Sequence, residues 1–136
     1  MNKFRIENVV FCEAVRQEIG NKHTLLGVSA PEVNIGEIPA TIAVALWISA
    51  RPTSTGPFKI DFRVLDVDKN ELVKAEAGGE VAALGRMVLV LGPLPINVQK
   101  PGDYEFEWAF GDDLWENIGT YKINLLQPEI TVASTS

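Results

Sequence analysis

The sequence predicts an all-β protein, an antiparallel β-sandwich that is immunoglobulin-like or a related Greek key, with about eight strands. Two segments are the main evidence. Between residues 103 and 110 aromatic side chains hold the even positions and acidic or small side chains the odd ones, and residues 58–64 repeat this alternation. Because successive side chains of a strand point to opposite faces, each segment has one core-facing row and one solvated row.

The other strands follow from apolar runs bounded by turn residues. Residues 41–50 are apolar on both faces, which predicts a central strand. Pro93 and Pro95 cannot donate to a ladder, so residues 94–98 are expected at an edge or in an irregular strand. Single helical turns are expected at residues 14–19 and 81–84. In order, the predicted strand segments span residues 4–12, 24–28, 32–35, 41–50, 58–67, 71–77, 87–91, 94–98, 104–110 and 118–126.

The same alternation predicts which side chains form the core. In the first strand Phe4, Ile6, Val10 and Cys12 are placed on one side, and Cys12 is interpreted as a small core hydrophobe. The other predicted core residues are Ile42, Val44, Leu46, Phe58, Ile60, Phe62, Val64, Tyr104, Phe106, Trp108 and Phe110.

Length and composition indicate one ordinary globular domain. The chain has 136 residues, which is the usual size of a domain that folds without disulfides or metals. We expect a single sandwich over residues 1–127 and a flexible tail over residues 128–136.

The charge of the chain argues against two classes of partner. The net charge is −6, and the 12 Lys and Arg residues form no cluster along the sequence. We therefore expect no binding to nucleic acid or to an anionic membrane. A single cysteine and a charged N-terminal stretch favour a cytoplasmic location.

No set of residues in the sequence predicts an enzyme. His23 is the single histidine, and it lies beside a glycine turn, so a histidine-based catalytic machine finds little support. Phosphate-binding and dinucleotide-binding motifs are absent from the sequence. We therefore expect neither catalysis nor a cofactor.

Acidic residues in two turns could bind calcium. Asp66 and Asp68 lie in one turn, and Asp112 and Asp113 in another. The first turn lacks the glycine and the glutamate of an EF-hand loop, although some sandwiches collect calcium ligands from several loops. The simpler interpretation is that aspartate stabilises turns through hydrogen bonds to nearby backbone.

Two further groups of residues have a structural and a functional interpretation. Glu105 and Glu107 share one face of a strand, and we interpret them as its solvated side rather than a carboxylate pair. Trp115, in a polar loop, is the tryptophan with the best chance of exposure, so it is a candidate anchor for a partner or ligand.

Charged residues also gather between the first two predicted strands. Glu13, Arg16, Glu18 and Lys22 fall within a short segment, and we interpret them as an ion-pair network rather than an anion site.

At this segment the chain resembles a family of small uncharacterised bacterial proteins. The matching pattern is an aromatic-Cys-acid triplet, then Arg, Glu, Lys and a Leu-x-Gly-Val strand. In this sequence it reads Phe11-Cys12-Glu13, Arg16, Glu18, Lys22 and Leu25-Leu26-Gly27-Val28. The resemblance implies that the four charged residues form a unit, and it implies no activity.

The leading hypothesis is a non-enzymatic interaction or structural module that binds a protein partner or self-associates. The alternative is a calcium- or carbohydrate-binding sandwich that uses its end loops. A useful observation for deciding among these hypotheses is whether the structure leaves one sheet face or edge apolar and uncovered.

Overall fold

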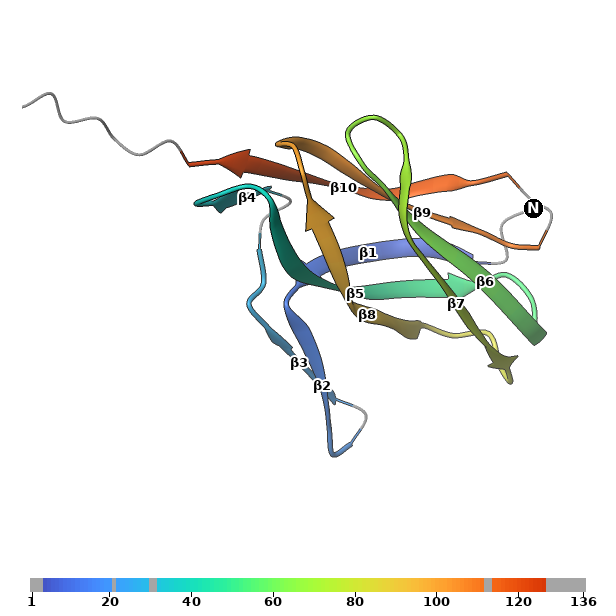
Figure 1. Cartoon of the computed structure of the whole chain (residues 1–136). Coiled ribbons are helices and arrows are strands. Elements are labelled where there is room, and N and C mark those ends of the chain that lie inside the picture. The colour runs from blue at the N-terminus through green and yellow to red at the C-terminus, as the bar shows by residue number, and fades with distance from the viewer. Residues whose placement is uncertain (1–3, 21, 30–31, 112–113, 127–136) are drawn as a thin grey trace, which may run out of the picture.

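A computed structural model describes residues 4–20, 22–29, 32–111 and 114–126 (Figure 1). The described residues form strands and turns, and contain no helix that could cross a membrane. The strands are β1 (Phe4–Cys12), β2 (Ala14–Glu18), β3 (Lys22–Leu26), β4 (Glu32–Ile35), β5 (Ala40–Pro52), β6 (Gly56–Leu65), β7 (Glu71–Val81), β8 (Met87–Val98), β9 (Gly102–Ala109) and β10 (Glu116–Leu125).

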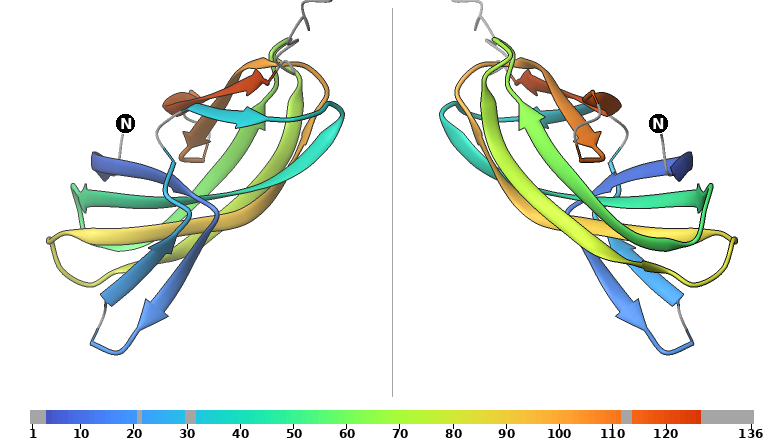
Figure 2. Two further views of the ribbon diagram at one scale, coloured as in Figure 1. Left: turned by 90° about the vertical axis from the view of Figure 1, so that its left-hand side faces the viewer. Right: turned by 90° about the vertical axis from the view of Figure 1, so that its right-hand side faces the viewer.

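These strands form the predicted β-sandwich. One sheet has the order β1-β5-β8, and the other has the order β4-β10-β9-β6-β7. All neighbours are antiparallel except β4 and β10, which pair in parallel. As predicted, β5 is central in its sheet and residues 94–98 lie at an edge. The prediction that residues 87–91 and 94–98 form two strands was wrong, because both belong to the single strand β8, which pairs with β5 on either side of Gly92. Strands β2 and β3 form a separate hairpin that projects from the sandwich (Figure 2).

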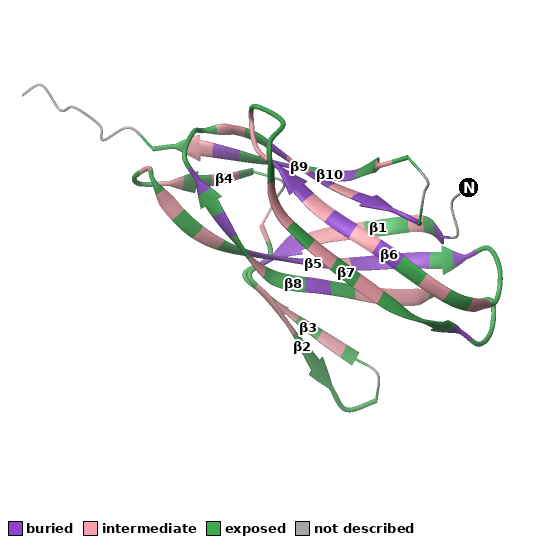
Figure 3. Ribbon diagram, turned by 45° about the vertical axis from the view of Figure 1, so that its right-hand side comes forward, coloured by how far each residue is buried: buried purple, intermediate pink, exposed green. Residues whose placement is uncertain are grey.

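The core lies between the two sheets and contains the predicted aromatic rows. Figure 3 shows buried positions alternating with intermediate ones along the second half of β6. Of the predicted core residues, Phe58 and Ile42 are half-buried and pack against the core cluster rather than lying within it. The other predicted core residues outside β1 are buried: Val44, Leu46, Ile60, Phe62, Val64, Tyr104, Phe106, Trp108 and Phe110.

Strand β1 does not keep one apolar row along its length. Its register with β5 shifts between Ile6 and Asn8, which marks a β-bulge at Glu7. Phe4 and Phe11 therefore both face the core, although the offset between their positions is odd. Val10 and Cys12 lie on the opposite side, so the single row predicted for this strand was wrong after Ile6.

The segment 14–18 is a strand, not the helical turn predicted from its helix-forming residues. Ala14–Glu18 pairs with Lys22–Leu26 across a turn that contains Gly20, at a φ of 82°. A hairpin satisfies the backbone of both segments, whereas one helical turn is too short to be stable alone. Residues 82–85 are likewise bends and loop rather than helix.

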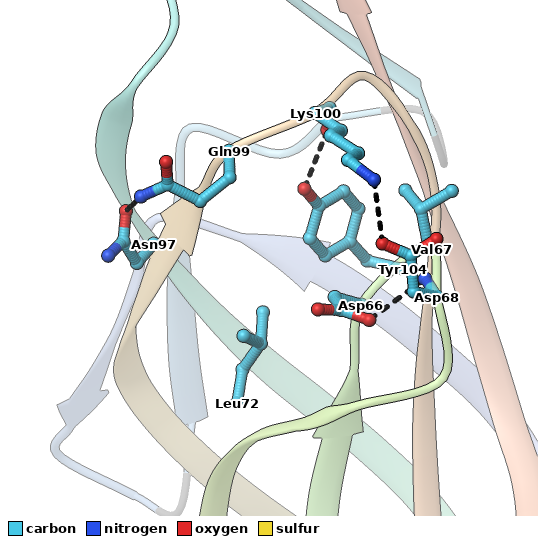
Figure 4. Close-up of a pocket in the computed structure, with 8 residues that line it drawn as sticks. All are labelled: Asp66, Val67, Asp68, Leu72, Asn97, Gln99, Lys100 and Tyr104. Atoms are coloured by element: carbon cyan, nitrogen blue, oxygen red, sulfur yellow. Dashed lines mark hydrogen bonds and ion pairs between the residues drawn. The ribbon is translucent and has the colours of Figure 1, made fainter.

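Tyr104 fixes the turn that leads into β9. Its hydroxyl donates a 2.6 Å hydrogen bond to the carbonyl oxygen of Lys100, four residues upstream (Figure 4). The tyrosine ring is buried, at 2% exposure, and burial raises the pKa of its hydroxyl. The bond connects the loop after β8 to the beginning of strand β9.

We expect Tyr104→Phe to lower the free energy of unfolding by about 1 kcal/mol, because one intramolecular hydrogen bond is lost. Since burial raises the pKa of Tyr104 in the folded state, the unfolded chain loses the hydroxyl proton at a lower pH than the folded protein, and the contribution of the tyrosine to stability is fully present at neutral pH. That contribution fades as pH rises above the ordinary tyrosine pKa of about 10.

Urea unfolding of both proteins at neutral and at alkaline pH measures this difference. The difference in the free energy of unfolding between wild type and Tyr104→Phe should be smaller at alkaline pH. A gap that stays constant or widens would contradict the role assigned to this hydroxyl.

Candidate interaction surface

The outer faces of the two sheets differ in chemistry. On the five-stranded sheet, opposite charges pair across neighbouring strands and turns. Arg63 lies 2.7 Å from Glu107, and Lys69 lies 2.6 Å from Glu105. Glu105 and Glu107 therefore belong to the solvated side of β9, and each has a cation as partner. This outer face is polar.

The outer face of the three-stranded sheet is apolar at its centre. Val10, Trp47 and Val90 come from three adjacent strands and lie opposite one another in register. Val88 lies two positions before Val90 in β8 and faces the same side of the sheet. We call these four residues the apolar face. Val90 is 44% exposed, and the other three are half-buried among the described residues.

A charged cluster borders the apolar face at one end. Arg5 and Arg51 are register partners on the same side of the sheet, and Arg86 precedes β8. One carboxylate oxygen of Glu7, Oε1, accepts 3.1 Å hydrogen bonds from the Nε atoms of Arg51 and Arg86. These bonds, the one from Arg86 first, lower the pKa of Glu7. We call the three arginines and Glu7 the arginine cluster.

An open groove joins the apolar face to the arginine cluster. Its volume is about 470 Å³. The indole nitrogen of Trp47 is buried and has no hydrogen-bond acceptor among the described residues. The groove is lined by Glu7, Asn8, Trp47, Ser49, Arg86 and Val88.

Strand β2 bounds the other end of the face. It begins just after Cys12, and it contacts β5 and β8. Cys12 and Ala45, paired in register on the outward side, are buried there at 3% and 0% exposure. Burial raises the pKa of the Cys12 thiol, which lies 3.7 Å from the Ala45 carbonyl oxygen. Cys12 is thus a buried, structural thiol under the base of the hairpin.

The four charged residues between the first strands do not form one cluster. Arg16 lies 4.0 Å from Glu18, which also accepts a hydrogen bond from Thr24, and Lys22 is opposite Glu18 in the hairpin ladder. Glu13 lies elsewhere, at the base of the hairpin. Arg16, Glu18 and Lys22 are exposed.

Glu13 and Gly27, from the two halves of the family-like pattern, lie against each other. The Glu13 backbone N–H donates a 2.9 Å hydrogen bond to the Leu26 carbonyl oxygen. Gly27 has a φ of 64°, and a Cβ atom built there would lie 2.6 Å from the Glu13 carboxyl carbon. Glu13 also lines a cavity of about 260 Å³ beside Tyr121. The pattern therefore describes the closure of this hairpin base.

We expect Gly27→Ala to lower the free energy of unfolding by about 1 kcal/mol, because alanine is strained at positive φ and Glu13 must move. Gly36→Ala is the matched control, since a Cβ atom there meets nothing within 4 Å. Urea unfolding of both variants measures the difference. Equal stabilities would contradict the role of Gly27.

The structure places two of the candidate calcium ligands in one turn. Asp66 Oδ1 accepts hydrogen bonds from the backbone N–H groups of Asp68 and Asn70, at 2.9 and 2.8 Å. Asp68 accepts a 2.9 Å bond from Lys100, which raises the pKa of that lysine. Both carboxylates thus have partners within the chain, at the pocket of Figure 4. Asp112 and Asp113 lie outside the described residues.

Metal-binding groups do not gather elsewhere in the part of the chain that the structure describes. No set of three His, Cys, Asp or Glu side chains there is close enough to hold one ion.

Trp115 is half-buried, and a cation covers its ring. The guanidinium carbon of Arg63 lies 4.2 Å from the ring centroid, and Arg63 also binds Glu107. The result is a stack of carboxylate, guanidinium and indole on the outer face of the five-stranded sheet. This packing leaves Trp115 less available as an anchor than its loop position predicts.

Arg63→Ala and Trp115→Ala should each destabilise the fold by about 1 kcal/mol, with a coupling of about 0.5 kcal/mol between them. The coupling arises because the cation and the ring stabilise each other. A double-mutant cycle in urea measures it, with Arg16→Ala as an exposed control. If the losses in unfolding free energy of the two single variants add up to that of the double variant, the contact between Arg63 and Trp115 contributes nothing to stability.

Sequence reasoning missed the arginine cluster. Glu7, Arg51 and Arg86 are far apart in the chain and meet through strand pairing. One residue in the sequence indicated an unusual outer face. Trp47 lies on the side of β5 that faces away from the core, where a solvent-exposed strand face normally carries polar residues.

The fold and surface define a class: a small β-sandwich with one polar and one partly exposed apolar sheet face. The chain belongs to the family of unknown function DUF6941, whose model matches residues 7–124. This match confirms the resemblance to an uncharacterised family. The family's function is unknown, so membership assigns no activity.

Solved structures with a similar chain path include a β-glucosidase from Listeria innocua and its complexes with glucose and isofagomine. They match at 14% identity with TM-scores of 0.43–0.44. The match covers 89–90% of this chain and 16% of the β-glucosidase chain. At this level the likeness gives no information on activity. No curated protein matches the sequence significantly.

Proposed function

We propose that the protein is a non-enzymatic interaction module that binds a protein partner through the apolar face. The observation that carries the proposal is the row of Val10, Trp47 and Val90, partly exposed on one sheet while the other sheet carries ion pairs. Contiguous apolar side chains at a surface, bordered by charges, are typical of interaction sites. Tryptophan is also the residue type most enriched at binding hot spots.

The strand order supports an immunoglobulin-like assignment, which is part of the proposal. A three-stranded sheet of the first, fifth and eighth strands faces a sheet in which β4 joins β10 in parallel. Tyr104, at the start of β9, bonds to backbone four residues upstream, as in the tyrosine corner of such domains. Sandwiches of this kind commonly serve recognition, although a fold alone does not define a function.

A distinct partner is favoured over a second copy of the chain. Two copies stacked on this face with their β1 strands parallel would bring their arginine clusters together, and like charges disfavour that arrangement. The calcium or carbohydrate alternative receives less support, since Asp66 and Asp68 already bind groups of this chain and Arg63 covers the Trp115 ring.

We expect Val90→Asp to abolish recovery of a specific partner from native cells, because it places a charge at the most exposed residue of the apolar face. Leu114→Asp is the matched control, since Leu114 is 91% exposed and lies at the other sheet. Quantitative mass spectrometry after crosslinking and purification compares wild type with both variants. Circular dichroism confirms that all three fold.

A protein lost with Val90→Asp and retained with Leu114→Asp supports the proposal. Equal recovery with both variants would refute it, and so would the failure of wild type to recover any protein reproducibly. Sedimentation of the purified chain adds a further check, because a dimer dissolved by Val90→Asp would assign the face to self-association.

A further inference from the structure

We infer that the groove beside Trp47 recognises an acidic segment of the partner, whose carboxylate binds Arg51 and Arg86 in place of Glu7. The inference rests on the proposed function and names the chemistry of the occupant. It follows from three features of the face: its charge balance, its geometry and its unused hydrogen-bond donors.

The charge balance of the face is opposite to that of the protein. The chain has a net charge of −6, yet the arginine cluster holds three cations and one carboxylate. Among the described residues, the arginine cluster is therefore short of anions. A segment rich in Glu or Asp is complementary to it, whereas a basic segment is not.

The hydrogen bonds to Glu7 occupy only some of the N–H donors of Arg51 and Arg86. Arg51 and Arg86 each donate to Glu7 through Nε, and both bonds end on the same oxygen atom. A guanidinium has five N–H donors in a planar fork that fits a carboxylate with two parallel bonds. An incoming carboxylate can thus make bonds that a single shared Glu7 oxygen does not provide.

The groove adds an apolar wall and further polar groups to this cluster. Trp47 and Val88 line it together with Asn8, Ser49 and Arg86. The buried indole N–H of Trp47 has no acceptor among the described residues, so a small ring rotation toward a partner oxygen is favourable. A peptide that alternates acidic and apolar side chains matches this arrangement.

A discrete acidic peptide fits better than an extended polyanion. The chain as a whole repels a long anionic polymer or lipid surface, because its net negative charge acts over about a Debye length. A short peptide segment meets the arginine cluster without approaching the acidic remainder of the molecule.

The test uses the full chain and two short end-capped peptides, one alternating Glu with Val and the other Lys with Val. Nuclear magnetic resonance titration follows the Trp47 indole N–H signal, assigned with Trp47→Phe. We expect the acidic peptide to shift this signal and the basic peptide to leave it unchanged. Added salt should weaken the acidic interaction.

Charge variants then separate recognition from non-specific attraction. Arg51→Gln and Arg86→Gln should each weaken binding of the acidic peptide by about fivefold. Arg16→Gln, on the hairpin, should leave it unchanged. Glu7→Gln should strengthen it, because the competing carboxylate is removed. All these residues are exposed, and the amide spectra check that each variant folds.

Several outcomes would overturn the inference. These are equal binding of both peptides, absence of any shift at millimolar acidic peptide, weaker binding by Glu7→Gln, or preferential binding to phosphatidylserine vesicles. If the acidic peptide fails while Val90→Asp still abolishes partner recovery, the proposed function stands and the acidic chemistry is refuted. If both experiments fail, the face is not a binding site.

Discussion

The β-bulge at Glu7 is the constraint on which much of this molecule depends. Phe4 and Phe11 are the aromatic anchors that β1 contributes to the core. The Phe4 ring stacks on Phe110 at 5.6 Å, and the Phe11 ring stacks on Tyr121 at 5.1 Å. In a regular strand an odd separation would turn one of these rings outward. The extra residue at the bulge lets both face the core.

The same bulge arranges the outer surface. It turns Glu7 toward Arg51 and Arg86, and it places Val10 beside Trp47. A single backbone irregularity thus links the packing of two core aromatics to the groove on the opposite side of the sheet. Bulges that re-aim side chains are frequent near functional sites, which agrees with the role proposed for this face.

The sequence shows how far side-chain periodicity extends and where it ends. Strands β6 and β9 are regular, so Phe62 and Trp108 could be assigned to the core from alternation. Strand β1 contains a bulge, and parity alone put Val10 and Cys12 on the wrong side. Local propensity suggested helix at residues 14–19, but pairing across Gly20 decided in favour of a hairpin. In both places strand pairing or a backbone irregularity outweighed the local preference of the residues.

The site could be predicted less well than the fold, because its parts come together through pairing. Glu7 and Arg86 occupy opposite edges of one sheet and meet across it. No spacing in the sequence indicates their contact. Trp115, by contrast, was identified as a candidate anchor from its loop, and the structure pairs it with Arg63 instead. A side chain in a polar loop is usually exposed to solvent. A residue of a neighbouring strand, here Arg63, can nevertheless cover it.

Two of the four edge strands of the sandwich, β8 and β7, discourage the addition of a strand, which supports a face as the proposed contact surface. The edge strand β8 carries Pro93 and Pro95, which remove two N–H donors, and β7 carries Lys74 and Glu76. Such residues discourage the addition of another strand. The apolar face has no comparable protection. It is bounded by the base of the hairpin at one end and by the arginine cluster at the other. In the proposed complex, the partner lies between the two boundaries, which suits a short segment better than a broad flat surface.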